Sequence, residues 1–373
     1  MRRLSRAEIA LFVFPFALVP AAIYGQRFKI AVTPRPVARP KIAPVSKPNL
    51  YSNFWPQTVT LLPSPDGRWV YTGVSGAATR TKYVKWNARN GELMCPLATS
   101  RFGDADAILS PDGKIFGYSE GGSQGDRVVL LDPSGGKEPA QINRPQGAHN
   151  EESSFDLSND LVALAAKNNV SVFRADNGQL FGKFAHRVLD YYPKNPRFSP
   201  DGRQLAWIGF SDRDFNSYAD GISSDEIVWF DTHTKKRLGA VQFSHCDLFG
   251  VRFSGDGRTL LVSGFRRFWA KGRADQNDIG AQAKLWAVDA RTGQTRWNWN
   301  LSGWIKDISV SPDGLFFAFE QNFGSSGDHI TVRELSSNRE VCRVPGQFSG
   351  QPAWSADSRT LYLPNWPIKR LEK

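Results

Sequence analysis

A short turn motif that begins with serine recurs seven times, and it constrains the fold more than any other feature of the chain. Four copies read Ser-Pro-Asp-Gly, and these residue types favour tight turns. Successive first serines lie between 41 and 57 residues apart, and runs rich in β-branched and aromatic residues separate the turns. Such runs are typical of β-strands. The seven turns begin at Ser64, Ser110, Ser158, Ser199, Ser254, Ser311 and Ser355.

Each repeat has the internal order of four short strands. In the fourth repeat, strand-like sequence leads into the turn at 195–199, leaves it at 205–208 and returns at 227–230. A fourth strand follows a polar hairpin. A period of about 40 to 50 residues with four strands per unit is the signature of a β-propeller. We therefore predict an all-β fold, a seven-bladed β-propeller over residues 49–373.

The last repeat is too short to complete a blade by itself. After its first two strands only residues 366–373 remain, enough for one more strand. The segment from Leu50 to Phe54 has strand-like sequence and precedes the first blade. We predict that it supplies the missing strand and closes the ring, which hides both sheet edges.

The repeats resemble the WD-repeat family, and their Pro-Asp-Gly turns are also similar to those of TolB-type periplasmic propellers. The family's serine matches most of the seven turns. Its structural histidine matches His149 and His245, each nine residues before a turn serine, and its tight-turn aspartate matches Asp126, Asp225 and Asp328. No Trp-Asp dipeptide ends a third strand, so the family's hydrogen-bonded tetrad is partial at best. The resemblance implies a binding or scaffold role.

The N-terminal tail divides into an apolar segment and a linker. Residues 1–26 contain an uncharged stretch from Ile9 to Gly25, preceded by three arginines. Its length is at the short limit for crossing about 30 Å of hydrocarbon. We predict a retained membrane anchor; a cleaved signal peptide and a buried segment are the alternatives. Residues 27–48 form a Pro/basic-rich linker, which favours extended polyproline II structure.

The basic charge of the chain belongs to this tail. The net charge is +11, but residues 1–50 hold nine basic side chains and one acid. The remaining chain has 38 basic and 35 acidic residues, so the propeller is nearly neutral. We therefore expect no nucleic-acid partner, since binding to a phosphate backbone needs a concentrated positive surface.

No pattern in the sequence indicates catalysis, a cofactor or a metal. The Gly-x-Ser-x-Gly match at 121–125 joins two strands, whereas a nucleophile elbow joins a strand to a helix. The five histidines are scattered without metal-ligand spacing. The segment 287–297 resembles the tryptophan-docking motif of quinoprotein propellers, but it occurs only once. We expect a non-enzymatic protein; a propeller enzyme, either a hydrolase or a quinoprotein-like oxidoreductase, is the alternative.

Two long insertions follow the second strands of neighbouring repeats, at 210–221 and 265–273. Both connections leave the same face of the ring, and long loops on a rigid scaffold often carry binding sites. Their aromatic and arginine side chains are types enriched at interface hot spots. The predicted partner-binding residues are Arg213, Phe215, Tyr218, Phe265, Arg266, Arg267, Phe268, Trp269, Lys271 and Arg273.

These features together predict a membrane-tethered β-propeller scaffold. We expect a monomeric propeller that binds a protein, or an acidic polymer, through the insertions of the fourth and fifth repeats. An arginine-rich start ahead of an apolar segment is typical of export signals. We therefore expect the propeller to be extracytoplasmic, periplasmic or extracellular; a secreted form and a cytoplasm-facing form are the alternatives.

This topology predicts the result of protease treatment. Protease added to intact cells or spheroplasts is expected to digest the propeller, because it lies outside the cytoplasm. Protection until lysis would mean the opposite orientation, and release by a mild salt wash would rule out the anchor.

Overall fold

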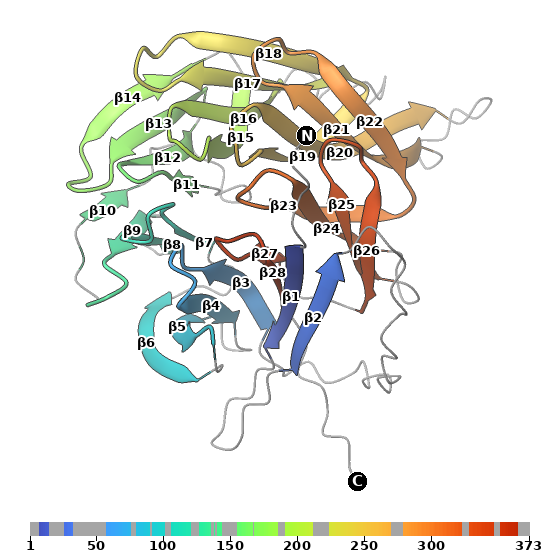
Figure 1. Ribbon diagram of the computed structural model, residues 1–373. Coiled ribbons are helices and arrows are strands. Elements are labelled where there is room, and N and C mark those ends of the chain that lie inside the picture. Colours follow the sequence, from blue (N-terminus) through green and yellow to red (C-terminus); the bar gives the residue numbers. More distant parts are fainter. Residues whose placement is uncertain are drawn as a thin grey trace, which may run out of the picture.

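The chain forms an all-β propeller, in which short sheets stand around a common centre (Figure 1). The computed structural model describes residues 7–14, 26–32, 57–75, 80–89, 92–100, 106–120, 127–135, 138, 140–143, 155–166, 168–185, 191–211, 224–269, 279–322, 328–346 and 351–364. Within these ranges every regular element is a β-strand. The strands group into six sheets, not into the seven separate blades that the sequence predicts.

Four of the sheets are four-stranded antiparallel units formed by consecutive strands. The first has β3 (Gln57–Pro63), β4 (Trp69–Ser75), β5 (Thr81–Asn87) and β6 (Leu93–Ser100). The second has β7 (Ala107–Leu109), β8 (Phe116–Glu120), β9 (Arg127–Leu131) and β10 (Ala140–Asn143). The third has β11 (Phe155–Leu157), β12 (Leu161–Ala166), β13 (Asn169–Arg174) and β14 (Leu180–Phe184). The fourth has β23 (Trp304–Val310), β24 (Phe316–Asn322), β25 (His329–Glu334) and β26 (Glu340–Pro345).

An eight-stranded sheet accounts for the lower number of sheets. It joins β15 (Tyr191–Phe198), β16 (Gln204–Ser211), β17 (Ser224–Asp231) and β18 (Arg237–Ser244) to β19 (Cys246–Phe253), β20 (Thr259–Trp269), β21 (Ile279–Asp289) and β22 (Thr295–Leu301). The two groups meet at a single parallel bridge, between Ser224 and Cys246. The fourth and fifth sequence repeats therefore share one hydrogen-bonded sheet.

The last sheet combines both ends of the chain. β27 (Ala353–Trp354) and β28 (Thr360–Pro364) pair with each other, β1 (Ala7–Phe14) pairs parallel to β28, and β2 (Gln26–Val32) pairs with β1. The predicted closing segment, Leu50 to Phe54, lies outside the described residues; the structure instead places two earlier strands at this edge. β1 includes the first part of the apolar stretch predicted to be an anchor. Across the described ranges, no helix has the length and apolar character needed to span a membrane.

The serine turns have one hydrogen-bonding pattern in six repeats. In the sixth repeat, the Ser311 hydroxyl donates to Asp313 Oδ1 at 2.6 Å and accepts from the Phe316 N–H at 2.9 Å. The Gly314 N–H donates to the Ser311 carbonyl at 2.8 Å, and Gly314 has a φ of 70°. Glycine adopts this left-handed conformation without the cost that a side chain adds. The turn at Ser158 is the shorter exception, because its hydroxyl accepts from the Leu161 N–H.

The core lies between neighbouring sheets, because each sheet buries both of its faces. Along β16, Leu205 and Trp207 pack toward β12–β14, whereas Ala206 and Ile208 pack toward β19–β21. This assignment follows from the two-residue period of a strand, which sends successive side chains to opposite faces. A near-continuous apolar run therefore contributes to two cores at once.

Substitution of a turn serine is expected to destabilise the fold. Ser311 is 0% exposed, so Ser311→Ala leaves the Phe316 N–H without its side-chain acceptor. The expected loss in the free energy of unfolding is about 1–3 kcal/mol, measured by urea titration. Ser337 is an exposed turn serine whose hydroxyl donates to Glu334, and Ser337→Ala is expected to change stability by less than about 0.5 kcal/mol. Equal losses for the two variants would contradict this account of the turn.

Deletion of the N-terminal strands tests the closure of the ring. Removal of residues 1–32 exposes the edge of β28, so the melting temperature is expected to fall, by about 2–4 °C for each kcal/mol lost. Removal of residues 1–6, which precede β1, is the matched control and is expected to leave the melting temperature unchanged. An unchanged melting temperature after the longer deletion would mean that residues 7–32 do not hold the last sheet together.

Candidate functional site

The hairpin of β20 and β21 extends beyond the sheet to which it belongs. Each strand has 11 residues, and their pairing continues from Thr259 with Asp289 to Trp269 with Ile279. β19 accompanies β20 only as far as Arg266, and β22 accompanies β21 only as far as Ala283. The sequence predicts a loop over 265–273, and this is wrong as far as Trp269, because cross-strand pairing keeps these residues in β20.

Three aromatic side chains meet at the base of this hairpin. The Phe265 ring lies edge-on to Phe249, with centroids 4.7 Å apart, and edge-on to Trp304, with centroids 4.3 Å apart. Phe265 is 6% exposed, whereas Phe249 is 40% and Trp304 is 62% exposed. Edge-to-face pairs of this kind are favourable beyond the apolar area that they bury. The cluster therefore has a buried centre and two rings that face solvent.

Local backbone features place the two exposed rings. Phe249 occupies the extra position of a β-bulge, since the β19–β20 register shifts between Leu248 and Gly250. A bulge redirects a side chain out of the normal alternation of a strand. Trp304 is the first residue of β23 and follows Gly303, whose φ is 80°. The position of Phe249 thus depends on a bulge within β19, and that of Trp304 on the turn that precedes β23.

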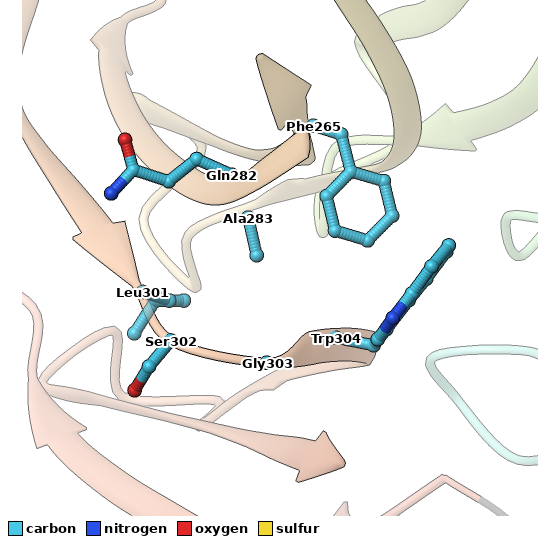
Figure 2. Close-up of a pocket in the computed structure, with 7 residues that line it drawn as sticks. All are labelled: Phe265, Gln282, Ala283, Leu301, Ser302, Gly303 and Trp304. Atoms are coloured by element: carbon cyan, nitrogen blue, oxygen red, sulfur yellow. The ribbon is translucent and has the colours of Figure 1, made fainter. Parts of the chain in front are cut away.

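A cavity of about 350 Å³ lies beside this cluster, between β20–β22 and the start of β23. Figure 2 shows the Phe265 and Trp304 rings together on one side of it and Gln282 on the other. Gln321 donates a side-chain hydrogen bond to the Ser302 carbonyl, which fixes the connection that forms one wall. Its lining consists of Phe265, Gln282, Ala283, Leu301, Ser302, Gly303 and Trp304; we call it the Trp304 cavity.

The structure describes only part of the predicted partner-binding set. Phe265 is a buried member of the aromatic cluster, not an exposed loop anchor, and Arg266 is exposed. Arg267, Phe268 and Trp269 lie in β20. The remaining predicted residues, Arg213, Phe215, Tyr218, Lys271 and Arg273, lie outside the described ranges.

Sequence analysis missed Phe249 and Trp304. Phe249 lies in the middle of β19 and Trp304 begins β23, and nothing in their spacing separates them from core residues. The one available signal for Trp304 is the Ser-Gly pair before it, which indicates a turn.

Two buried carboxylates lie near the inner strands and pair with basic residues of β15. Asp225 Oδ2 accepts from the Leu248 N–H at 2.7 Å and lies 3.6 Å from Lys194 Nζ. Burial raises the pKa of Asp225 to about 6, although Lys194 and the Leu248 N–H act to lower it. Asp225 is one of the three residues that match the tight-turn aspartate of the WD-repeat family.

The second pair links neighbouring sheets. Asp156 Oδ2 on β11 accepts from the Phe198 N–H at 2.6 Å, and Asp156 Oδ1 lies 4.0 Å from Arg197 Nη1. Burial raises the pKa of Asp156 to about 6, against the opposing effects of Arg197 and the Phe198 N–H. Asp225 and Asp156 each have a basic partner of their own and lie in separate places, so we interpret them as structural ion pairs.

A second cavity, of about 430 Å³, lies between the first two serine turns. Its carboxylates are already engaged: Asp66 accepts from Ser64, Asp112 from Ser110, and Asp132 from Ser134. These bonds stabilise the turns themselves. In the part of the chain with described side chains, no group of three His, Cys, Asp or Glu residues could hold a metal ion.

The segment similar to a quinoprotein docking motif forms a hairpin turn with a packing role. Asp289 Oδ1 accepts from the Arg291 and Thr292 N–H groups, and its Oδ2 pairs with Arg296 at 2.6 Å. Trp297 Nε1 donates to the Leu335 carbonyl at 2.9 Å, which joins β22 to the next sheet. The Gly-x-Ser-x-Gly match at 121–125 lies outside the described residues.

Comparisons with known proteins support the fold. No family model matches the sequence, and no curated protein matches it. A solved structure of Kuenenia stuttgartiensis hydrazine synthase is similar, with a TM-score of 0.62 over 87% of this chain and 96% of that chain at 14% identity. A mitotic checkpoint complex chain has a TM-score of 0.57 over 89% of this chain and 96% of that chain, also at 14% identity. One belongs to an enzyme and the other to an assembly, so the likeness does not choose a function.

The raised pKa of Asp225 predicts how Asp225→Asn changes stability with pH. The folded protein binds this proton more tightly than the unfolded chain, where the pKa is about 3.9. The contribution of Asp225 to stability therefore falls as pH rises from about 4 to about 6. Relative to wild type, Asp225→Asn is expected to gain stability across this window, by up to about 1.4 kcal/mol for each unit of pKa difference. Urea titrations at several pH values measure the gain.

Asp231 is a control with the opposite sign. The hydrogen bond from the Thr234 N–H is the main cause that lowers the pKa of Asp231. The stability that Asp231 contributes is therefore present above its unfolded pKa and is lost as pH falls. Asp231→Asn should therefore cost most at neutral pH. A stability difference for Asp225→Asn that does not change with pH would contradict the assignment.

Proposed function

We propose that this protein is a non-enzymatic, membrane-tethered β-propeller scaffold of the WD-repeat or TolB type. It binds a protein partner, or an acidic polymer, through the β20–β21 hairpin and the neighbouring insertion at 210–221. In this proposal the eight-stranded sheet acts as the fourth and fifth of seven blades. The apolar segment from Ile9 to Gly25 attaches the chain to a membrane, with the propeller on the extracytoplasmic side.

The aromatic cluster at the base of the hairpin is the observation that supports this proposal most. Phe249 and Trp304 expose apolar area next to a cavity, and exposed aromatics around a recess are typical of binding surfaces. The exposed Arg266 adds positive charge on the other face of the same hairpin. A rigid propeller with a projecting hairpin suits binding, since the scaffold holds the contact residues in place.

Membrane attachment and the observed last sheet exclude each other in one molecule. β1 contains residues 7–14 and pairs with β28, whereas an anchor needs the segment from Ile9 onward in the bilayer. The attached form therefore requires β1 to leave the sheet. A lower melting temperature for the 1–32 deletion variant would indicate that β1 and β2 stabilise the propeller from within the last sheet. An unchanged melting temperature would indicate that they do not.

Partner capture tests the proposal directly. A photo-crosslinking amino acid is placed at Gln282, on the rim of the Trp304 cavity, and crosslinked products are isolated from the cells that express the protein. The triple variant Arg266→Ala, Arg267→Ala and Trp269→Ala is expected to reduce recovery of the main product at least tenfold, about 1.4 kcal/mol. The same crosslinker at Leu315, an exposed residue of the Ser311 turn, serves as the positional control.

The result against the proposal is equally specific. If the triple variant keeps its fold by circular dichroism and yields the same crosslinked product in the same amount, the hairpin is not the partner surface. If the product appears only from position 315, the partner binds at the opposite end of the strands.

A further inference from the structure

We infer that the outer edge of β21 is a peptide site, where an extended acidic peptide adds as a strand and places one apolar side chain in the Trp304 cavity. The inference rests on the proposed function and deepens it, because it names the chemistry of the partner. Three observations carry it: a strand edge with no partner strand among the described residues, a cavity with two aromatic rings in its wall at the end of that edge, and an exposed arginine on the neighbouring strand.

The unpaired edge lies at residues 279–282. β20 pairs with β21 along its whole length, from Ile279 to Asp289. On the other side, β22 pairs with β21 only from Ala283 to Val288, and within the described chain no strand pairs with 279–282 on this side. Unpaired backbone groups at a sheet edge are a template for another strand, and addition of a peptide strand to such an edge is a common mode of recognition.

The cavity begins where this edge ends. Gln282 belongs to the unpaired edge and also lines the Trp304 cavity, and Ala283 and Leu301 are the next cross-strand pair. At about 3.3 Å per residue, four residues of edge span about 13 Å, enough for a short peptide segment. Alternate side chains of that segment face the cavity side. The walls formed by Phe265 and Trp304 suit one large apolar side chain, in the manner of an interface anchor.

The charge of the hairpin favours an acidic peptide. Arg266 is exposed and is the cross-strand partner of Gln282. In the sequence from 265 to 282, four basic residues stand against two acidic ones, although the chain after residue 50 is nearly neutral. Arg266 points to the sheet face opposite Phe265, because neighbouring residues of a strand alternate. Acidic side chains should therefore occupy the peptide positions on either side of the apolar anchor.

A set of synthetic peptides tests the site with the full-length protein. The parent probe is fluorescein-labelled Glu-Thr-Glu-Leu-Glu-Thr-Glu, and binding is measured by fluorescence polarisation. Replacement of the central leucine by alanine removes the anchor, and replacement of all four glutamates by lysine reverses the charge. Each change is expected to weaken binding at least tenfold.

Substitutions in the protein test whether the peptide binds at the Trp304 cavity and beside Arg266. Trp304→Ala is expected to weaken binding of the leucine peptide at least fivefold and to leave the weak binding of the alanine peptide unchanged. Arg266→Glu is expected to weaken the glutamate peptide and to strengthen the lysine peptide. Leu315→Ala and Arg203→Glu are the matched controls, since both residues are exposed and lie at serine turns; neither should change binding.

Methylation of peptide nitrogens separates strand addition from simple apolar contact. In an extended peptide, alternate N–H groups point to opposite edges. N-methylation of the set that faces β21 should abolish binding, whereas methylation of the other set should not. Equal effects of the two sets would overturn the strand-addition model.

Several other outcomes count against the inference. It is overturned if the leucine and alanine peptides bind equally, if polyglutamate competes as well as the parent probe, or if no peptide binds up to about 1 mM. Dimerisation of the protein that Trp304→Ala abolishes would assign the edge to a second copy of the chain. If the peptides fail but crosslinking at Gln282 still depends on Arg266, Arg267 and Trp269, the scaffold function stands and only the peptide site is wrong.

Discussion

The structure depends on the burial of both faces of each sheet against neighbouring sheets. β17 shows the constraint, since Val228 and Phe230 face the core shared with β12–β14, while Ile227 and Trp229 face the core shared with β19–β21. No single sheet can bury these residues alone, so stability comes from the ring as a whole. The serine turns serve this packing, because each serine hydroxyl accepts from the backbone N–H at the start of the next strand, as Trp69 and Phe316 show.

The candidate binding surface follows from this arrangement. β20 and β21 continue to pair with each other beyond the last residues that pair with β19 and β22. Among the described residues, the continuation leaves 267–269 of β20 and 279–282 of β21 without a partner strand on their outward sides. The aromatic cluster of Phe249, Phe265 and Trp304 lies at the base of this hairpin. Because the ring fixes the base of the hairpin, a partner that binds there meets a largely preformed surface. Preformed surfaces lose less conformational entropy on binding.

The propeller fold could be predicted from the serine turns. The pairing between strands of different repeats could not be predicted. The spacing of the serines predicts the propeller, and the Ser-Asp hydrogen bonds at Ser64 and Ser311 show the physical basis of the motif. The number of separate sheets was wrong because one bridge, between Ser224 and Cys246, merges two repeats. No pattern within a single repeat encodes such a bridge. The pairing of β1 with β28 was not predicted, because apolar sequence at 7–14 fits a strand and an anchor equally well. The predicted closing segment, Leu50 to Phe54, lies outside the described residues.

The candidate site likewise contains residues that could be predicted from the sequence and residues that could not. The insertion after the second strand of the fifth repeat is visible in the sequence, and Arg266, one of the predicted partner-binding residues, is exposed. Phe249 was not predicted, because its exposure depends on a bulge against β20. Trp304 was not predicted, because an aromatic at the start of an inner strand normally belongs to the core. The Phe249–Phe265 contact joins consecutive strands across that bulge, whereas the Phe265–Trp304 contact joins β20 to β23, which are separated in the sequence.

Hydrogen–deuterium exchange of the full-length protein, with and without its crosslink-identified partner, tests the central claim most directly. The account predicts that the partner slows exchange in the segments 279–283 and 301–304 and leaves the serine turns unchanged. Protection of backbone amides at these two segments would place the partner on the β21 edge and the Trp304 cavity. Protection confined to the serine turns or to the inner strands β11 and β15 would contradict the account and place the partner elsewhere on the ring.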